Sequence, residues 1–175
     1  MKKPIAAVPS LRTATREDGA FLLAVRNAPE VRARSKNQEI IPEAIHYAWL
    51  NARLHDPGAV IWILEHQGER EGYVRAQEIE ARTWLLSIAL QARFQRQGHG
   101  AWALREASRL LFEVRGACCL VAEVIAANSA ARRLFEVAGF IPKSIEVQDG
   151  LDMARFTLYA ETPRWLADHL TTKDD

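Results

Sequence analysis

Apolar residues recur at helical spacing, three, four and seven positions apart, in three parts of the chain. The first repeat follows a capping sequence at 15–18, and the second begins after Pro42, which suits the first position of a helix. The residues predicted to form the buried faces are Phe21, Leu22 and Val25, then Ile45, Ala48, Trp49 and Ala52, then Leu104, Ala107, Ser108 and Leu111. Two shorter helices are predicted, one from the cap residue Asn128 to Gly139 and one from Thr162-Pro163 onward.

Runs of apolar or alternating residues predict strands between these helices. The segment 59–64 is largely β-branched and aromatic, which is typical of a strand buried on both faces. The other predicted strands span residues 11–13, 73–79, 83–90, 118–125, 145–147 and 156–158. Gln67-Gly68 and Asp149-Gly150 are predicted turns. This order of elements predicts one domain, 1–175, in which helices cover both faces of a mixed α/β sheet with one central crossover.

The composition fits a domain that folds without disulfides or metal ions. The 175 residues are 49% hydrophobic and 26% charged, which are ordinary values for globular domains. The net charge of +1 is too small to drive nonspecific nucleic-acid binding, and no apolar run is long enough to span a membrane. The two cysteines, Cys118 and Cys119, are neighbours in an apolar segment rather than a spaced pair. We therefore expect a cytoplasmic protein that binds neither nucleic acid nor membrane.

The segment with the most chemical information lies between a predicted strand and a predicted helix. It reads Gln95-Arg96-Gln97-Gly98-His99-Gly100. Glycine lets backbone N–H groups turn inward, and the first turn of the following helix adds free donors and the positive end of a dipole. Such a loop suits a pyrophosphate, although the same spacing also serves in a plain turn between a strand and a helix.

A second motif follows on the expected elements. The strand 122–125 is succeeded by Asn128, Ala131, Leu134-Phe135 and Gly139-Phe140. Together the two motifs resemble the GCN5-related N-acetyltransferase (GNAT) superfamily, whose acetyl-CoA motif reads Gln/Arg-x-x-Gly-x-Gly/Ala after a splayed strand. The resemblance covers nearly the whole chain and implies a mostly antiparallel mixed sheet of about seven strands. It also implies acetyl-CoA as the co-substrate, with no metal.

The resemblance carries the cofactor contacts over residue by residue. In the family, backbone amides matching 97–101 hold the CoA pyrophosphate, and the strand matching 88–90 pairs with the pantetheine arm where the sheet opens. A backbone N–H of that strand, here placed at Leu90, polarises the thioester carbonyl while the amine attacks directly in a ternary complex. The implied cofactor-binding residues are Ile88, Ala89, Leu90, Gln95, Arg96, Gln97, Gly98, His99, Gly100, Ala101, Asn128, Ala131 and Phe135.

One carboxylate interrupts the apolar strand 118–125. An ionised Glu123 is costly there unless it faces a partner or a wet cleft. Some peptide-acetylating members of the family carry a base at this place, so Glu123 is a candidate for the group that removes the ammonium proton. The alternative is a structural ion pair with Arg132 or Arg133.

The tyrosine that acts as general acid in many members is absent, because the chain has Phe135 at that position. Phenylalanine cannot protonate a leaving thiolate. The thiolate then leaves unassisted or takes its proton from another donor, such as Ser87 or Tyr73. A strand serine is usually packed, and a tyrosine at the start of a strand usually lies at a surface edge, so the sequence does not assign the acid.

The first third of the chain, at 26–32 and 41–50, resembles a subset of the family that acetylates nucleotide-linked amino sugars, as in pseudaminic acid-type glycan pathways. In that subset a histidine matching His46 belongs to the acceptor side, although a histidine beside an apolar stripe is often only a boundary residue. A basic stretch with Arg32 and Arg34 suits a nucleotide diphosphate, or simply faces solvent. The acceptor-binding residues expected are Arg26, Lys36, His46, Gln77 and Ser87.

The remaining histidines suggest no metal site. His55, His66 and His169 have no metal-ligand spacing, and the backbone of His99 is expected to matter more than its ring. We therefore expect a metal-independent N-acetyltransferase that acts on the amine of a nucleotide-activated amino sugar. The alternatives are an acetyltransferase for protein N-termini or other small amines, and a non-catalytic acetyl-CoA-binding module. A homodimer is compatible with the family but not indicated by the sequence.

Overall fold

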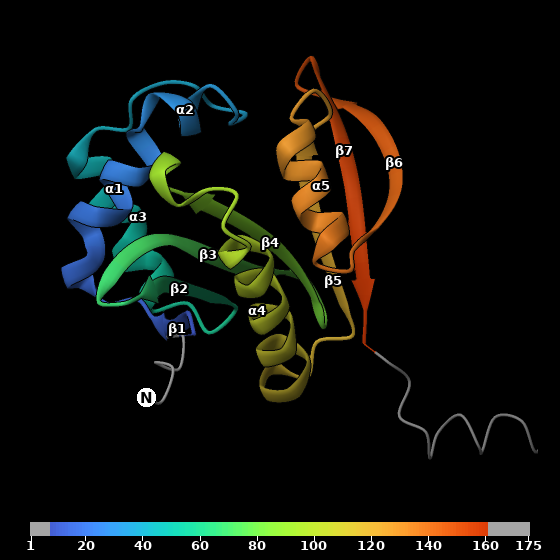
Figure 1. Ribbon diagram of the computed structural model, residues 1–175, viewed down its shortest axis with the longest axis horizontal. Helices are drawn as coiled ribbons and strands as arrows, with labels where there is room; N and C mark the ends of the chain where they lie inside the picture. Colours follow the sequence, from blue (N-terminus) through green and yellow to red (C-terminus); the bar gives the residue numbers. More distant parts are fainter. Residues whose placement is uncertain (1–7, 161–175) are drawn as a thin grey trace, which may run out of the picture.

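The computed structural model describes residues 8–160 and shows a seven-stranded sheet flanked by helices (Figure 1). The strand order is β1-β2-β3-β4-β5-β7-β6, and every neighbouring pair is antiparallel except β4 and β5. The elements in chain order are β1 (Ser10–Thr13), η1 (Arg16–Asp18), α1 (Gly19–Asn27), α2 (Pro29–Arg32), α3 (Glu43–Leu54), β2 (Ala59–His66), β3 (Glu69–Glu80), β4 (Thr83–Leu90), η2 (Ala92–Phe94), α4 (His99–Arg115), β5 (Cys119–Ile125), α5 (Ser129–Val137), β6 (Ile141–Gln148) and β7 (Leu151–Tyr159). The mixed, mostly antiparallel sheet with one crossover through α4 is confirmed. The predicted C-terminal helix with Trp165 lies outside the described residues.

Both predicted turns form hairpins. Gln67-Gly68 and Asp149-Gly150 have positive φ at all four residues, which is the conformation that matches the twist of two paired strands. Gln148 pairs with Leu151 directly across the second turn. Residues 151–154, which the predicted strands omit, therefore belong to β7.

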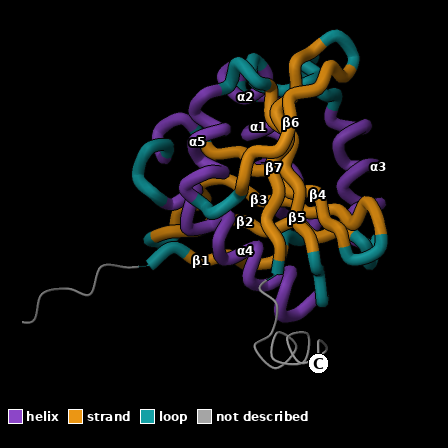
Figure 2. Tube along the Cα trace, turned by 90° about the vertical axis from the view of Figure 1, so that its right-hand side faces the viewer, coloured by secondary structure: helices purple, strands orange, loops and turns teal. Residues whose placement is uncertain are grey.

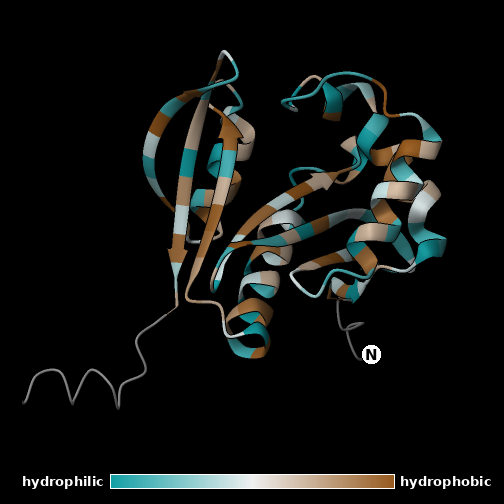
Figure 3. Ribbon diagram, turned by 180° about the vertical axis from the view of Figure 1, so that it is seen from behind, coloured by the Kyte–Doolittle hydropathy of each residue, from teal (hydrophilic) through white to brown (hydrophobic). Residues whose placement is uncertain are grey.

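The helices cover both faces of the sheet, as expected. Helices α4 and α5 pack against one face around a core that includes Trp62, Leu104 and Phe156, while α1 and α3 cover the other face around Ile61 and Leu50 (Figure 2). In Figure 3, α1 and α3 show both hydrophobic and hydrophilic residues, which is typical of helices with one side on a sheet.

The buried face of α3 differs from the predicted one. Ile45 is 63% exposed, and Ala48 and Ala52 are exposed as well, whereas His46 and Leu50 are buried. The interface with α1 explains the difference, because a polar group can be buried when it is hydrogen-bonded. His46 Nε2 donates to the carbonyl oxygen of Gly19 at 2.9 Å. Pro42 is the cap residue of α3 rather than its first helical residue.

The pairing of β4 with β5 is short. It comprises Thr83 with Cys119, Trp84 with Leu120 and Leu85 with Val121, and no pair follows among the described residues. Both strands continue beyond this point, to Leu90 and Ile125, so they separate. This opening of the sheet is the gap expected from the sequence resemblance.

An ion pair between the partly exposed Arg12 and the buried Asp18 fixes β1 to the start of α1. The Arg12 guanidinium donates two 2.7 Å hydrogen bonds to the carboxylate of Asp18, which is buried and also accepts from the Thr15 amide. These bonds, above all those from Arg12, lower the pKa of Asp18 to about 2. A carboxylate whose folded pKa is below its unfolded value stabilises the fold above the unfolded pKa, and this stabilisation is lost as the pH falls.

We expect Asp18→Asn to lower the free energy of unfolding by about 2 kcal/mol at pH 7, because one pKa unit corresponds to about 1.4 kcal/mol. The advantage of the wild type should shrink as the pH falls from about 4 toward 2, where its carboxylate becomes protonated. Urea unfolding of both proteins at several pH values measures this. A difference between them that did not change with pH would contradict the assignment.

Candidate active site

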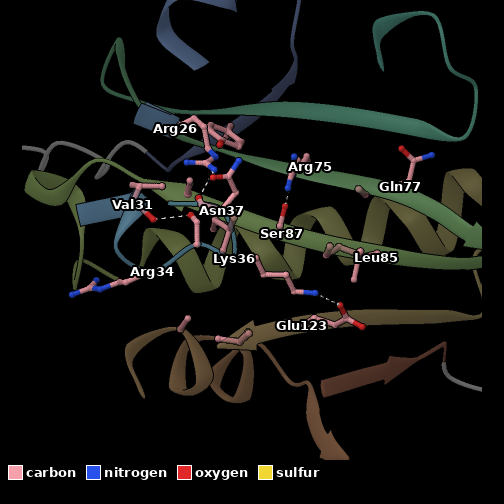
Figure 4. A pocket seen from close by; sticks show the side chains of 18 of the residues that line it. Arg26, Val31, Arg34, Lys36, Asn37, Arg75, Gln77, Leu85, Ser87 and Glu123 are labelled. Carbon is pink, nitrogen blue, oxygen red and sulfur yellow. Dashed lines mark hydrogen bonds and ion pairs between the residues drawn. The ribbon is translucent and has the colours of Figure 1, made fainter. Parts of the chain in front are cut away.

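A cavity of about 630 Å³ lies where β4 and β5 separate (Figure 4). This volume is in the range of small-molecule sites. One wall comes from α1, α3 and the segment between them, the floor from β3 and β4, and the other wall from β5 and α5. The lining holds five basic side chains and one acidic one, which are Arg26, Arg34, Lys36, Arg53, Arg75 and Glu123.

Glu123 extends from β5 into this cavity, with its side chain 20% exposed. Lys36 Nζ lies 3.2 Å from Glu123 Oε2 (Figure 4). Gln148 Nε2 donates to Glu123 Oε1 at 3.4 Å, and Arg155 Nη1 is 3.9 Å from the same oxygen. The expected pairing with Arg132 or Arg133 is therefore wrong. Arg132 instead donates to the carbonyl oxygen of Ala126.

The glycine loop leaves backbone amides free at the start of α4. Trp102 makes the first helical bond, donating to the Gly98 carbonyl at 3.1 Å, so the amides at 99–101 precede the hydrogen-bonded helix. Gly98 has φ of 84° and no side chain caps the helix. Gly100 is closely packed, because a Cβ there would lie 2.9 Å from Leu90 Cδ1 and the Leu90 side chain would have to shift. The loop thus has the geometry of an anion site.

The other predicted cofactor residues lie around the opening of the sheet. The Asn128 side chain accepts a hydrogen bond from the Ala131 amide at 3.1 Å and so begins α5 as predicted. Leu90 does not line the cavity, because its side chain packs beside Gly72 and Gly100, which leaves only its backbone for the expected role. Five of the predicted cofactor residues line the cavity: Ile88, Ala89, Asn128, Ala131 and Phe135.

Two residues expected to bind the acceptor have other partners. His46 is 3% exposed, does not line the cavity and holds the Gly19 carbonyl, so the structure gives it a position in the α1–α3 interface. Burial lowers the pKa of His46, which keeps the imidazole neutral at pH 7. Gln77 lies at the cavity edge, but its amide is bonded to Arg53, Asp56 and the Gly58 carbonyl.

In the basic stretch 32–36, one arginine holds the backbone in place and two other basic residues line the cavity. Arg32 donates to the carbonyl oxygens of Asn27 and Gln38 and does not line the cavity, so it fixes the course of this segment. Arg34 and Lys36 do line it. The expectation of an anion-facing stretch therefore applies to Arg34 and Lys36 only.

Arg26 provides a buried donor for a ligand. Its Nη2 donates to the Asn37 carbonyl at 2.8 Å, whereas its buried Nη1 has no hydrogen-bond partner in the described part of the chain. Burial lowers the pKa of Arg26, and the nearby cations Arg75 and Arg32 lower it further. An anion beside Nη1 would satisfy the donor and neutralise this repulsion.

Sequence reasoning missed Arg75 and left Tyr73 open between a proton donor and a residue at a surface edge. Arg75 pairs with Ser87 across β3 and β4, and its Nε donates to the Ser87 hydroxyl oxygen at 2.7 Å (Figure 4). Tyr73 lines the same cavity and is buried rather than at a surface edge. Burial raises the pKa of Tyr73, so its phenol stays protonated at neutral pH. The alternation of β3, which puts residues 73, 75 and 77 on one face, was the available signal.

Residues 22–140 match the model of the acetyltransferase (GNAT) family, which is more than half of the chain. The chain therefore belongs to this family and is an N-acetyltransferase with acetyl-CoA as donor. The open amides at 99–101 and the divided sheet fit that donor. No curated protein matches the chain. In the described part of the chain, no helix is both long and apolar enough to cross a membrane.

Several solved acetyltransferases share the fold. The spermidine N-acetyltransferase of Vibrio cholerae, in complex with CoA and spermine, is 19% identical, with 86% of this chain and 95% of that one covered at a TM-score of 0.79. An aminoglycoside acetyltransferase in complex with coenzyme A is 17% identical. The match covers 94% of this chain and 99% of that one, with a TM-score of 0.75. A ribosomal-protein-alanine N-acetyltransferase from Brucella melitensis is 24% identical. The match covers 86% of this chain and 99% of that one, with a TM-score of 0.74.

Proposed function

We propose that the enzyme acetylates the primary amine of an anionic small molecule, a nucleotide-activated amino sugar. The charge of the cavity carries this proposal, since five basic side chains and one acidic one leave a formal excess of four positive charges. Among the described residues, Arg26, Arg34 and Arg75 form no ion pair with a carboxylate. A guanidinium group can donate two parallel hydrogen bonds to two oxygens of one phosphate, so these three arginines suit a diphosphate.

The same charge disfavours the acceptors named for the structural neighbours. Spermidine and aminoglycosides carry several positive charges at neutral pH, and a cavity of like charge repels them. The low identity to these enzymes, 17% to 19%, supports a shared fold rather than a shared acceptor. The cavity therefore supports an acceptor that combines one amine with several negative charges.

The proposed roles follow from position. Acetyl-CoA supplies the thioester, and the amides at 99–101 hold its pyrophosphate. Glu123 removes a proton from the acceptor ammonium, so that the nitrogen can attack the acetyl carbon. Of the two expected donors to the departing CoA thiolate, Tyr73 fits better, because its protonated phenol lines the cavity and a phenol releases a proton more readily than the aliphatic hydroxyl of Ser87. Because acetyl-CoA is available in the cytoplasm, the proposal places the enzyme there.

A second candidate acceptor is the N-terminal amine of a peptide. Glu123 favours it, since this carboxylate stands in the cavity at the place where peptide-acetylating relatives carry a base. The alternative of a non-catalytic acetyl-CoA-binding module is set aside, because the chain belongs to an acetyltransferase family and both a carboxylate and a protonated phenol line the cavity.

The proposal is tested by CoA-thiol release from acetyl-CoA with four acceptors: a UDP-linked amino sugar, the same free amino sugar, spermidine and a short peptide. We expect kcat/KM for the nucleotide-linked sugar to exceed that for spermidine by about 100-fold or more, as two or three charge-assisted hydrogen bonds would produce. Turnover of only the peptide would establish the second candidate. Saturable acetyl-CoA binding without turnover of any of the four would refute both proposed acceptors and mean that the enzyme acts on another amine.

A further inference from the structure

Three side chains of metal-binding type meet outside the cavity. They are His66 at the end of β2, Glu71 in β3 and His99, the first residue of α4, and their ligand atoms all lie within 4.8 Å of one another. Glu71 Oε2 is 2.7 Å from His99 Nδ1, and Glu71 Oε1 is 3.4 Å from His66 Nδ1. The two imidazole rings are 4.4 Å apart between centroids.

The burial of Glu71 makes this cluster unusual. Its side chain is 1% exposed, and a buried carboxylate is costly unless a cation or several donors compensate its charge. The neighbouring arginines are engaged elsewhere, Arg70 with Asp18 and Arg93 with Glu69. In the described residues, the ionic contacts of the Glu71 carboxylate are the two imidazoles. The carboxylate is therefore satisfied by hydrogen bonds from these rings or by an ion that the three side chains bind together.

The distances suit an ion. Zinc bonds of about 2.0–2.1 Å at tetrahedral angles place neighbouring ligand atoms roughly 3.3 Å apart. Glu71 Oε1 is 3.4 Å from His66 Nδ1, which matches this value, and 2.9 Å from His99 Nδ1, so an ion would need the His99 ring to move back by a few tenths of an ångström. Imidazole nitrogen selects zinc and other transition ions over magnesium and calcium. Two imidazoles and a carboxylate also form a familiar three-ligand zinc set with a fourth position for water.

We propose that His66, Glu71 and His99 bind one divalent transition-metal ion, with Zn²⁺ as the best match. None of the three lines the cavity, so the ion has no part in the acetyl transfer itself. It connects the β2–β3 hairpin to the first residue of α4, next to the free amides of the glycine loop. The imidazoles are 16% to 18% exposed, which leaves access for the ion and a water ligand.

Titration of the tag-free protein with Zn²⁺, Co²⁺ and Mg²⁺ tests this proposal. We expect one Zn²⁺ per chain with a Kd below about 10 μM, an intense visible Co²⁺ spectrum of a tetrahedral site, and no Mg²⁺ binding. Zinc at 100-fold excess over Kd should raise the Tm by about 5–10 °C. No saturable Zn²⁺ binding, or a Co²⁺ spectrum of a six-coordinate site, would overturn the proposal and leave a hydrogen-bonded cluster.

Variants locate the ion. His66→Gln and His99→Gln should each weaken Zn²⁺ binding by about 10-fold or more, and Glu71→Gln likewise if it folds. His55→Gln is the matched control, because His55 is exposed at the end of α3 and, within residues 8–160, forms a hydrogen bond with the Asn51 carbonyl alone. Circular dichroism and the Tm in EDTA report whether each variant is folded. Unchanged affinity in folded His66→Gln and His99→Gln would place the ion elsewhere and refute the site.

Discussion

Replacement of Glu123 by glutamine is expected to lower kcat by about 100-fold at pH 7, the contribution of a positioned general base. The KM for acetyl-CoA should stay within about twofold, because Glu123 projects from β5 into the cavity while the proposed pyrophosphate site is at the start of α4. Steady-state kinetics with the best acceptor of the panel measures both constants. The defect should shrink as the pH rises above the pKa of the acceptor amine, since solvent then removes the proton that Glu123 otherwise takes.

Lys36→Met separates this role from a structural ion pair. It removes the 3.2 Å contact with Glu123 but keeps the carboxylate. We expect its kcat to remain within about threefold of wild type, as for a partly exposed ion pair without a chemical role. Equal losses of kcat in Glu123→Gln and Lys36→Met, independent of pH, would mean that the ion pair matters and the base does not.

Arg26→Met is expected to lower kcat/KM for a nucleotide-linked amino sugar by about 10- to 100-fold. The buried Nη1 of Arg26 has no partner in the described structure, and a hydrogen bond between a guanidinium and a phosphate contributes about 1.5–3 kcal/mol. The free amino sugar, which lacks the diphosphate, should be affected by less than about twofold. The comparison of the two acceptors isolates the anion, because a general loss of activity would reduce both.

Arg133→Met is a matched control for the lost charge, since Arg133 is exposed on α5 and does not line the cavity. It should leave kcat/KM for both acceptors unchanged. Arg26 also donates to the Asn37 carbonyl, so thermal melting should accompany the kinetics. If Arg26→Met changed the two acceptors by the same factor, the proposed anion contact would be wrong.

Local signals were sufficient to predict most of the sheet. The hairpin turns need residues that tolerate positive φ, and Gln67-Gly68 and Asp149-Gly150 supply them. Asn128 begins α5 because its side chain accepts the Ala131 amide, an interaction within four residues. The glycine loop is equally local. These features depend on residues that are close together in the sequence, so the sequence pattern is sufficient to predict them.

Features that depend on distant partners could not be predicted. The buried face of α3 is set by Gly19 of α1, whose carbonyl satisfies His46 and whose missing Cβ leaves room for the Tyr47 ring. Gln77 was expected to bind the acceptor, but its side-chain amide is hydrogen-bonded to Arg53 and Asp56. In each case a side chain with suitable chemistry found a partner that no local pattern reveals.

The contact between Lys36 and Glu123 also bears on selectivity. Lys36 carries a primary ammonium group, the same group that an acceptor presents, and it bonds to Glu123 and to Gln148 Oε1 at 3.2 and 2.7 Å. Because it is tethered to the chain, this ammonium competes with free amines at a high effective concentration. A small amine has only its own charge with which to displace it. An acceptor that also binds Arg26 and Arg75 gains binding free energy from these contacts and can displace Lys36 from Glu123. The competing lysine therefore favours large anionic acceptors over small amines.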